Sequence, residues 1–271
     1  MQYDPIKSML GRFFNRTPFL RIVFYRLLNI LLLRSWHVRR ALKTFFNRHK
    51  NQDNLHILDA GSGFGQYSWV MAKSNPHWQI TGLEIKQEQV DDCKVFFRQA
   101  GYKNVKFQYA DLTTYTLPDS YNLILSVDVM EHIEEDVLVF KNFYTSLKPG
   151  GMLLISTPSD QGGSGVEHEH EESFIEEHVR DGYGLDEIKS KLTEAGFSNI
   201  QVNYTYGAPG KISWILSMKY PILLLGISKL FLALLPFYYL LVFPFCLILN
   251  YFDLKGTHST GTGLLVKAIK N

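Results

Sequence analysis

Apolar positions follow two different spacings along this chain, and the change between them marks the predicted elements. From about residue 50 to about residue 206, short apolar runs alternate with stretches of helical spacing. Short runs bounded by turn residues are typical of buried strands. The first predicted strand ends at residue 58. The others cover 79–84, 105–109, 121–127, 152–156, 198–206 and 263–270. This alternation predicts one large α/β domain with additions at the N-terminus and before the last strand.

A glycine-rich turn follows the first predicted strand directly. The run Ile57–Gly65 places glycine at positions 61, 63 and 65, where it permits positive φ and lets a ligand approach the backbone. The helix predicted over Gln66–Lys73 directs its free N–H groups toward this loop. The dinucleotide fingerprint would need glycine at position 66, and the lysine of a phosphate loop is absent. The turn therefore favours a nucleotide-type ligand of another kind.

The spacing Asp59-x-Gly61-x-Gly63-x-Gly65 resembles motif I of class I S-adenosylmethionine-dependent methyltransferases. Further segments follow in the order of that family, and the loop after the fourth strand resembles that of ubiquinone-type and related small-molecule methyltransferases. The resemblance covers about residues 50–206 and the last strand. It implies a Rossmann-like sheet of seven mostly parallel strands with helices on both faces, and S-adenosylmethionine as the cofactor.

The resemblance also assigns roles at the ends of the strands. An acid in the first turn suits the cationic amino-acid end of the cofactor, Glu84 can accept hydrogen bonds from a ribose diol, and Asp111 would meet the adenine amino group. The complete set of expected cofactor-binding residues is Asp59, Gly61, Ser62, Gly63, Gly65, Glu84, Ile85, Asp111, Leu112 and Asp128.

Two loops offer groups for the chemistry, because the family places such groups after strands four and five. The expected catalytic residues are Glu131 and His132 in the first loop and His168 in the long segment 157–184. A histidine with a pKa near neutrality can act as general base for an oxygen or carbon acceptor. Arg180 could hold an anionic head group. An amine acceptor would need no dedicated base.

Interpretations of the same residues without a catalytic role stay open. His132 can simply cap or pack at a helix start, and the alternating His and Glu residues of 167–172 can form a solvated acidic loop or a weak metal site. No metal is predicted, because the spacing lacks a fixed tetrahedral pattern. The two cysteines, Cys93 and Cys246, form neither a metal spacing nor a disulfide framework, which is consistent with a reducing compartment.

The first 50 residues carry a strong positive charge. They contain eleven of the 28 Lys and Arg residues against one acid, Asp4, and they lack the short apolar core and small-residue cleavage site expected of a signal peptide. Thr17-Pro18 predicts a helix start, and 19–33 is apolar except for a narrow polar stripe, Arg21, Tyr25 and Asn29. A second helix is predicted from Trp36. Basic amphipathic helices favour anionic membrane surfaces, so membrane contact is the first interpretation of this arm. The second is a cap over the sheet and the active site, and the third is nucleic-acid binding.

The insertion before the last strand is strongly apolar. Residues 230–252 contain no charged side chain, which satisfies the length rule for a membrane span. A single crossing is excluded if strands six and seven are antiparallel neighbours, because the chain must return to the side from which it left. The prolines at 221, 236 and 244 are expected to break or kink the helices. A half-immersed helical hairpin is favoured over two full spans, and a dimer interface or an apolar lid remains an alternative.

The sequence thus predicts a basic helical arm over 1–50, a methyltransferase domain over 51–207 and 261–271, and a membrane-associating insertion over 208–260. The expected activity is methyl transfer to a lipophilic or membrane-resident small molecule on the cytoplasmic face of a membrane, without nucleic acid as a partner. One alternative is a soluble metabolite or protein acceptor, with the insertion as an oligomer interface. Another is a membrane-bound scaffold without enzymatic activity.

Overall fold

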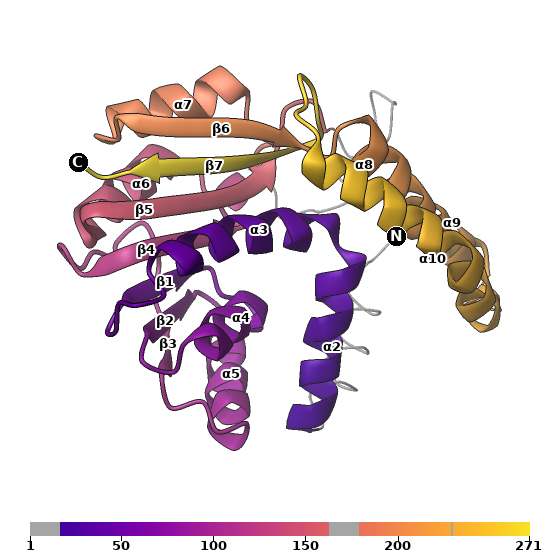
Figure 1. The fold of residues 1–271 in the computed structure, drawn as a ribbon, viewed down its shortest axis with the longest axis horizontal. Helices are drawn as coiled ribbons and strands as arrows, with labels where there is room; N and C mark the ends of the chain where they lie inside the picture. The colour runs from indigo at the N-terminus through magenta and orange to yellow at the C-terminus, as the bar shows by residue number, and fades with distance from the viewer. Residues whose placement is uncertain (1–16, 163–178, 229) are drawn as a thin grey trace.

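The computed structural model describes residues 17–162, 179–228 and 230–271. They form an α/β fold around a seven-stranded sheet in the order β3-β2-β1-β4-β5-β7-β6 (Figure 1). β7 is antiparallel to its neighbours β5 and β6, and β1 to β5 pair with one another in parallel. The strands are β1 (His56–Ala60), β2 (Gln79–Glu84), β3 (Val105–Tyr109), β4 (Tyr121–Val127), β5 (Leu147–Pro158), β6 (Asn199–Thr205) and β7 (Gly263–Ile269).

Helices cover both faces of this sheet, because successive strand residues point to opposite sides. Ile57 of β1 packs in a cluster with α3 and α4, while Leu58 packs in a second cluster with α6 and α7. The helices are α2 (Pro18–Leu31), α3 (Leu33–Arg48), α4 (Gln66–Ser74), α5 (Gln87–Gln99), α6 (Asp136–Ser146), α7 (Leu185–Glu194), α8 (Ala208–Trp214), α9 (Tyr220–Ile227) and α10 (Phe231–Lys255). The predicted fold class is confirmed.

The strand order reverses between β1 and β4, which are neighbours although two strands lie between them in sequence. In open α/β sheets the crevice outside the carboxyl ends of the strands at such a switch point is where ligands bind. The loops that follow β1, β2, β3 and β4 all reach this edge, because these four strands run in the same direction. The fold therefore places the predicted cofactor residues along one edge.

The two N-terminal helices form a corner beside the sheet. Thr17 caps α2 by accepting a hydrogen bond from the Leu20 N–H at 3.2 Å. The second helix begins at Leu33 instead of the predicted Trp36, since only Leu32 leaves the helical conformation, with φ −92° and ψ 112°. One extended residue is enough to redirect the chain, so the corner is sharp (Figure 1).

Helix α2 buries the polar stripe that the sequence contains. Its buried residues are Arg21, Tyr25 and Asn29. Phe19 and Leu27, by contrast, leave 72% and 42% of their surface exposed. This orientation is the reverse of an ordinary surface helix, which turns its apolar face to the core.

The insertion folds as a helical hairpin that leaves the sheet after β6 and returns at β7 (Figure 1). The chain runs through α8, a π-helical turn over Ile215–Lys219 and α9, and then turns back into α10. Both strands that flank the hairpin lie side by side at one edge, so the chain returns to the side from which it left, as predicted. Of the predicted break or kink, a break does not occur at Pro236 or Pro244, because helix α10 continues through both.

The base of the hairpin is fixed by a buried carboxylate. Asp253 is fully buried and accepts hydrogen bonds from the Gly210 N–H at 3.0 Å and the Tyr206 N–H at 3.3 Å. His37 of α3 lies 2.8 Å from the same carboxylate, and His258 lies at 3.3 Å. Charge-assisted contacts of this kind lower the pKa of Asp253, chiefly through His37. The cluster ties both arms of the hairpin to α3.

Candidate functional site

The loop between β1 and α4 needs glycine at each of its three glycine positions. Gly61, Gly63 and Gly65 have φ of +75°, +52° and +80°. A Cβ on Gly61 would lie 2.3 Å from Cγ2 of Val129, and a Cβ on Gly65 would lie 2.9 Å from the Phe97 ring. The first approach brings the glycine loop against the loop after β4, so two of the predicted segments meet at the switch point, while the second brings it against α5.

Glu84, at the end of β2, fixes the shape of that loop. One of its carboxylate oxygens accepts a hydrogen bond from the Gly63 N–H at 2.9 Å. The other accepts from the N–H groups of Ile85 and Lys86, both at 3.0 Å. Ile85 itself is exposed beside it. The acid that the sequence predicted for a ribose therefore lies in contact with the glycine loop.

Asp59 is buried at the end of β1, where it points toward α4. The Ser68 hydroxyl donates to its carboxylate at 2.6 Å, and burial raises the pKa of Asp59 to about 6. Ser62 follows in the loop, and its buried hydroxyl has no hydrogen-bond partner among the described residues. A buried acid with a raised pKa is a common feature of functional sites.

Asp111 and Leu112 follow β3 on the same edge of the sheet. One Asp111 carboxylate oxygen accepts hydrogen bonds from the Thr113 N–H at 2.8 Å and from its hydroxyl at 2.7 Å. Leu112 is buried and belongs to the core cluster beneath. The loop is thus held rigid, with an acid and an apolar side chain where the resemblance expects an adenine.

Asp128 pairs with Arg34, a residue that sequence reasoning missed. The two side chains form an ion pair between the start of α3 and the loop after β4. Asp128 has a positive φ of +51°, which is unusual for a residue other than glycine. The signal that could have found Arg34 is a lone cation directly after the apolar run Leu31-Leu32-Leu33.

Glu131 is buried next to this ion pair. Its carboxylate accepts a hydrogen bond from the Thr157 hydroxyl at 3.0 Å. Burial raises the pKa of Glu131, while the nearby His132 and Arg34 act in the opposite direction. His132 is half-buried in the same 3₁₀ turn, Met130–His132. His168 lies outside the described residues. The structure therefore brings Glu131, His132 and Asp128 together.

Arg180 is engaged inside the protein instead of facing a free space. Its guanidinium forms an ion pair with the buried Asp136 and donates to the Ile133 carbonyl at 2.8 Å. Lys191 and the Tyr183 hydroxyl also contact Asp136, both at 2.7 Å. These contacts lower the pKa of Asp136. The arrangement ties the segment after β5 to α6 and α7, so Arg180 here has a structural role.

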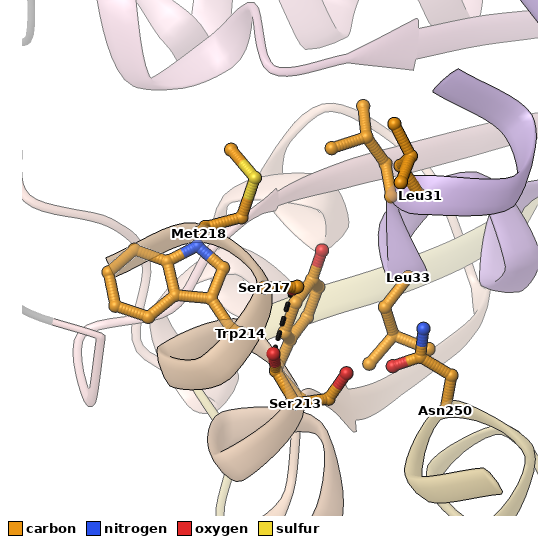
Figure 2. A pocket seen from close by; sticks show the side chains of 9 residues that line it. Leu31, Leu33, Ser213, Trp214, Ser217, Met218 and Asn250 are labelled. Carbon is orange, nitrogen blue, oxygen red and sulfur yellow. Dashed lines mark hydrogen bonds between the residues drawn. The ribbon is translucent and has the colours of Figure 1, made fainter. Parts of the chain in front are cut away.

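Tyr206 connects the site to the hairpin. The Tyr206 hydroxyl accepts a hydrogen bond from the Arg34 backbone N–H at 2.9 Å. The backbone of Tyr206 has a strained φ of +55°. Tyr206 also lines a pocket between the corner of α2 and α3 and the hairpin, shown in Figure 2. The rest of the lining is mostly apolar and comprises Leu31, Leu32, Leu33, Ser213, Trp214, Ser217, Met218 and Asn250.

Asn250 is the polar exception on the α10 side of this pocket. Its side chain is buried, and its Oδ1 atom has no hydrogen-bond partner among the described residues. Across the pocket the Ser217 hydroxyl donates to the Ser213 carbonyl at 2.8 Å (Figure 2). The pocket therefore presents an apolar surface with one available acceptor, next to the residue that binds Arg34.

No group of three or more potential metal ligands gathers among the residues that the structure describes. The alternating His and Glu run of 167–172 lies outside them. Cys93 and Cys246 are both buried and unpaired. Burial raises the pKa of the Cys93 thiol to about 12, so this thiol stays protonated near neutral pH.

Comparison with known proteins agrees with this geometry. A family model described as a methyltransferase domain matches residues 51–202, more than half of the chain. Phosphoethanolamine N-methyltransferase 1 of Zea mays is 30% identical over 161 residues, which is 58% of this chain and 31% of that enzyme. Ubiquinone biosynthesis O-methyltransferase of Aeromonas salmonicida is 30% identical over 105 residues, covering 37% of this chain and 42% of that enzyme.

A solved structure has the same fold. Haemonchus contortus phosphoethanolamine N-methyltransferase 2, in complex with phosphomonomethylethanolamine and S-adenosylhomocysteine, aligns with a TM-score of 0.60 and 22% identity. The alignment covers 86% of this chain and 52% of that one. The chain spans about a third of the length of the first curated relatives that it matches.

Proposed function

Because the chain belongs to the methyltransferase-domain family of class I S-adenosylmethionine-dependent enzymes, we propose that it methylates a lipophilic small molecule at a membrane. The observation that carries this proposal is the position of the hairpin. Its base meets α3 through Asp253 and His37, and Tyr206 at its start binds the Arg34 N–H. Arg34 pairs with Asp128 at the carboxyl edge of the sheet, so the apolar hairpin adjoins the edge where the chemistry occurs.

The residues at the switch point fit S-adenosylmethionine. When bound, this cofactor supplies an electrophilic methyl group on a sulfonium. Glu84 and Asp111 would hold the ribose and adenine ends, and Asp59 with Asp128 would face the cationic part. The open loop at Gly63 supports this fit, since a Cβ there would meet only the Gln89 side chain within 4 Å. Ser62, Gly61, Gly65, Ile85 and Leu112 would complete the cradle.

Glu131 is our choice for the proton acceptor, with His132 beside it. Burial raises the Glu131 pKa, and the Thr157 hydroxyl holds the carboxylate in place. Methyl transfer is an in-line displacement, so the remaining task of the protein is to orient the acceptor and take its proton. His168 remains a second candidate for this task.

The hairpin has the features of a membrane-associated element. Helix α10 is long and apolar enough to cross a bilayer, and almost none of its most apolar stretch is buried inside the protein. In lipid, backbone groups must find partners within the protein. We propose that the hairpin of residues 208–260 is half-immersed in a membrane on its cytoplasmic face, while 51–207 and 261–271 form the catalytic domain and 1–50 the basic arm.

The first arm of the hairpin supports this interpretation at its π-helical turn. The Tyr220 backbone N–H donates to the Ile215 carbonyl, five residues earlier, so the Leu216 carbonyl loses the donor that an α-helix would give it. The Ser217 carbonyl also loses its donor, because Pro221 has no N–H. The Tyr238 hydroxyl donates to Leu216 at 2.6 Å, and the Tyr239 hydroxyl donates to Ser217 at 2.8 Å. Both orphaned carbonyls are therefore satisfied without water.

The test compares the lipids of cells that contain the protein with those of cells that lack it. We expect a membrane-extracted compound to gain the mass of one CH₂ only when the protein is present. A deletion of residues 208–260 should remove both the membrane association and this product. Unchanged methylation of a water-soluble acceptor by the deletion variant would instead favour the soluble-acceptor alternative, in which the insertion joins protein copies.

The role of Glu131 can be tested on the acceptor identified in this way. Glu131→Gln removes the proton acceptor and preserves the side-chain shape, so we expect kcat to fall at least about 100-fold. The affinity for S-adenosylmethionine, measured by calorimetric titration, should stay unchanged. Glu134→Gln, at an exposed position in the same segment, is the matched control. An unchanged kcat for Glu131→Gln would remove this residue from the chemistry.

A further inference from the structure

The inner stripe of α2 holds the backbone of the cofactor loop. The guanidinium of Arg21 donates to the Phe64 carbonyl at 2.7 Å and to the Asp92 carboxylate of α5 at 2.6 Å. The Tyr25 hydroxyl donates to the same Phe64 carbonyl. Arg21 is almost completely buried, and its charge lies 4.6 Å above the ring of Phe96. These contacts attach α2 firmly to the turn between β1 and α4.

The residue that α2 holds lies at the centre of the glycine motif. Phe64 stands between Gly63 and Gly65, which have positive φ and leave the loop many conformations in the absence of such contacts. One turn further along α2, the side chain of Asn29 accepts a hydrogen bond from the Gln66 amide at 2.9 Å. The position of α2 therefore decides how well the cofactor loop is ordered.

The outer face of the same helix is apolar and exposed. Phe19, Leu27 and Ile30 leave 72%, 42% and 46% of their surfaces uncovered by the described residues. Arg26 lies exposed among them. The sequence around this helix is basic and contains no acidic residue between Asp4 and Asp53. An apolar face with flanking cations is the pattern of a helix that lies in the headgroup layer of an anionic bilayer.

The proposed membrane contact of the hairpin makes this face of α2 a candidate for a second contact. Figure 1 shows α2 standing with α4 and α5 on one side, while α9 and α10 extend on its other side. The corner of α2 and α3 touches the hairpin at the pocket lined by Leu31, Leu33 and Trp214. In this view the hairpin extends on the side of α2 away from α4 and α5, so a bilayer that receives the hairpin is expected to meet that side of α2 as well.

We propose that the outer face of α2 docks on an anionic lipid bilayer, and that this docking tightens S-adenosylmethionine binding through the Arg21 and Tyr25 contacts with Phe64. Coupling between two binding sites is reciprocal, so cofactor binding also strengthens docking. This inference shares the membrane with the proposed function but does not depend on which acceptor is methylated. It makes α2 a link between the membrane surface and the cofactor.

The first test measures S-adenosylmethionine affinity for the full chain by calorimetry, on vesicles of phosphatidylcholine with phosphatidylglycerol and in uncharged detergent micelles. The double variant Leu27→Asp/Ile30→Asp adds two charges to the outer face. On vesicles we expect its Kd to be at least about fivefold weaker than that of the unmodified protein. In micelles the two Kd values should agree, because the inner stripe is untouched.

The matched control is Leu117→Asp/Leu138→Asp, whose positions are 46% and 43% exposed but lie far from α2 in the chain. It should keep the affinity of the unmodified protein in both media. Equal affinity of the α2 variant on vesicles would overturn the proposal. Weaker binding in vesicles and micelles alike would also overturn it, because the effect would then come from the fold and not from the membrane.

A second measurement reports docking directly. A nitroxide spin label on Leu27→Cys, compared with one on Leu138→Cys, is read by its collisions with oxygen and with a water-soluble nickel chelate. Both native cysteines are buried, so they compete little for the label. On anionic vesicles the label at 27 should be protected from the nickel chelate and accessible to oxygen, whereas the label at 138 should show the opposite. Equal exposure of both labels to the chelate would contradict docking.

Discussion

Helices α2 and α5 contact each other, but they bury different kinds of residue. Helix α5 buries the apolar residues Val90, Cys93, Phe96 and Phe97 and leaves its charges, except for the partly buried Asp92, in solvent. Helix α2 buries an arginine, a tyrosine and an asparagine and exposes the large apolar side chains Phe19, Leu27 and Ile30. The difference teaches that amphipathicity predicts a helix, while the neighbours of the helix decide which face turns inward.

The reason is what each helix covers. Helix α5 packs on the apolar surface of the sheet through Phe107, so burying its apolar face releases water. Helix α2 meets an exposed carbonyl, Phe64, and a carboxylate, Asp92, whose burial needs hydrogen-bond donors. The hairpin repeats the construction of α2, because its polar groups point inward at Asp253 while its apolar side chains remain exposed.

The largest effect is expected where this inward polar contact is removed. Arg21→Met keeps the length of the side chain but removes the ion pair with Asp92 and one of the two donors to the Phe64 carbonyl. We expect the free energy of unfolding to fall by about 2–3 kcal/mol, because the buried Arg21 loses its hydrogen bond to Phe64 and its ion pair with the partly exposed Asp92. Thermal unfolding in detergent, with Arg98→Met on the exposed side of α5 as control, measures this. A loss no larger than that of the control would make the polar stripe incidental.

Asp59 is a buried acid at the end of β1, and its contribution to the free energy of unfolding depends on pH. The folded protein holds a proton on Asp59 with a pKa of about 6, against 3.8 for the ordinary side chain, because burial disfavours the charge. Asp59 therefore destabilises the cofactor-free protein above pH 6, and this penalty disappears as the pH falls from about 6 to below about 4. At neutral pH it amounts to about 2–3 kcal/mol.

Asp59→Asn removes this penalty, so the variant should unfold at a higher temperature than the unmodified protein at neutral pH and at the same temperature near pH 4. Thermal unfolding across that pH range measures the difference. Asp91→Asn, on the exposed side of α5, should show no such convergence. A constant gap between Asp59→Asn and the unmodified protein at every pH would show that the carboxylate does not titrate as described.

In the hairpin, the corresponding polar contact is the hydrogen bond from the Tyr239 hydroxyl to the Ser217 carbonyl. Tyr239→Phe removes the donor to the Ser217 carbonyl, and we expect a loss of about 1–3 kcal/mol, the cost of a buried unsatisfied acceptor. The measurement is thermal unfolding in detergent micelles. Tyr251→Phe alters a tyrosine of the same helix whose ring is largely exposed. Equal behaviour of the two variants would mean that water or lipid replaces the lost donor.

The smallest effect is expected on the outer face of α2. Leu27→Ser should change the free energy of unfolding by no more than about 0.5 kcal/mol, because its side chain contributes little to the fold. Phe97→Ala on the buried face of α5 should cost about 3–5 kcal/mol. Thermal unfolding of both variants in detergent gives the contrast directly. A similar loss in both would show that the two helices are built alike.

Much of the fold could be predicted because its signals are local. The strands at 79–84, 105–109 and 121–127 have the bounds that were expected from their apolar runs. The glycine loop was recognisable because its spacing is fixed within a few residues. Strand β5 begins at Leu147, earlier than predicted, because it pairs with Tyr121 across Pro149 and two glycines that look like a turn in isolation.

The candidate site was predicted only in part, for the same reason. The acids that follow the strands could be placed from the sequence, since parallel strands deliver their carboxyl ends to one edge. Arg34 could not, because its partner Asp128 is 94 residues away and lies on another element. The structural engagement of Arg180 by Asp136 was equally invisible in the sequence, since an arginine in a loop has the same composition whether it is free or paired.

The amino-acid sequence by itself determined the family, the order of the strands along the chain, the glycine turn and the existence of two apolar additions, because each depends on spacing within one short segment. Only the tertiary structure decided that α2 turns its polar stripe to the Phe64 carbonyl, that Arg34 reaches Asp128, and that Tyr238 and Tyr239 satisfy the carbonyls that Pro221 leaves open. Those choices depend on which buried polar groups meet across long stretches of chain, where an unpaired group costs more than an exposed leucine.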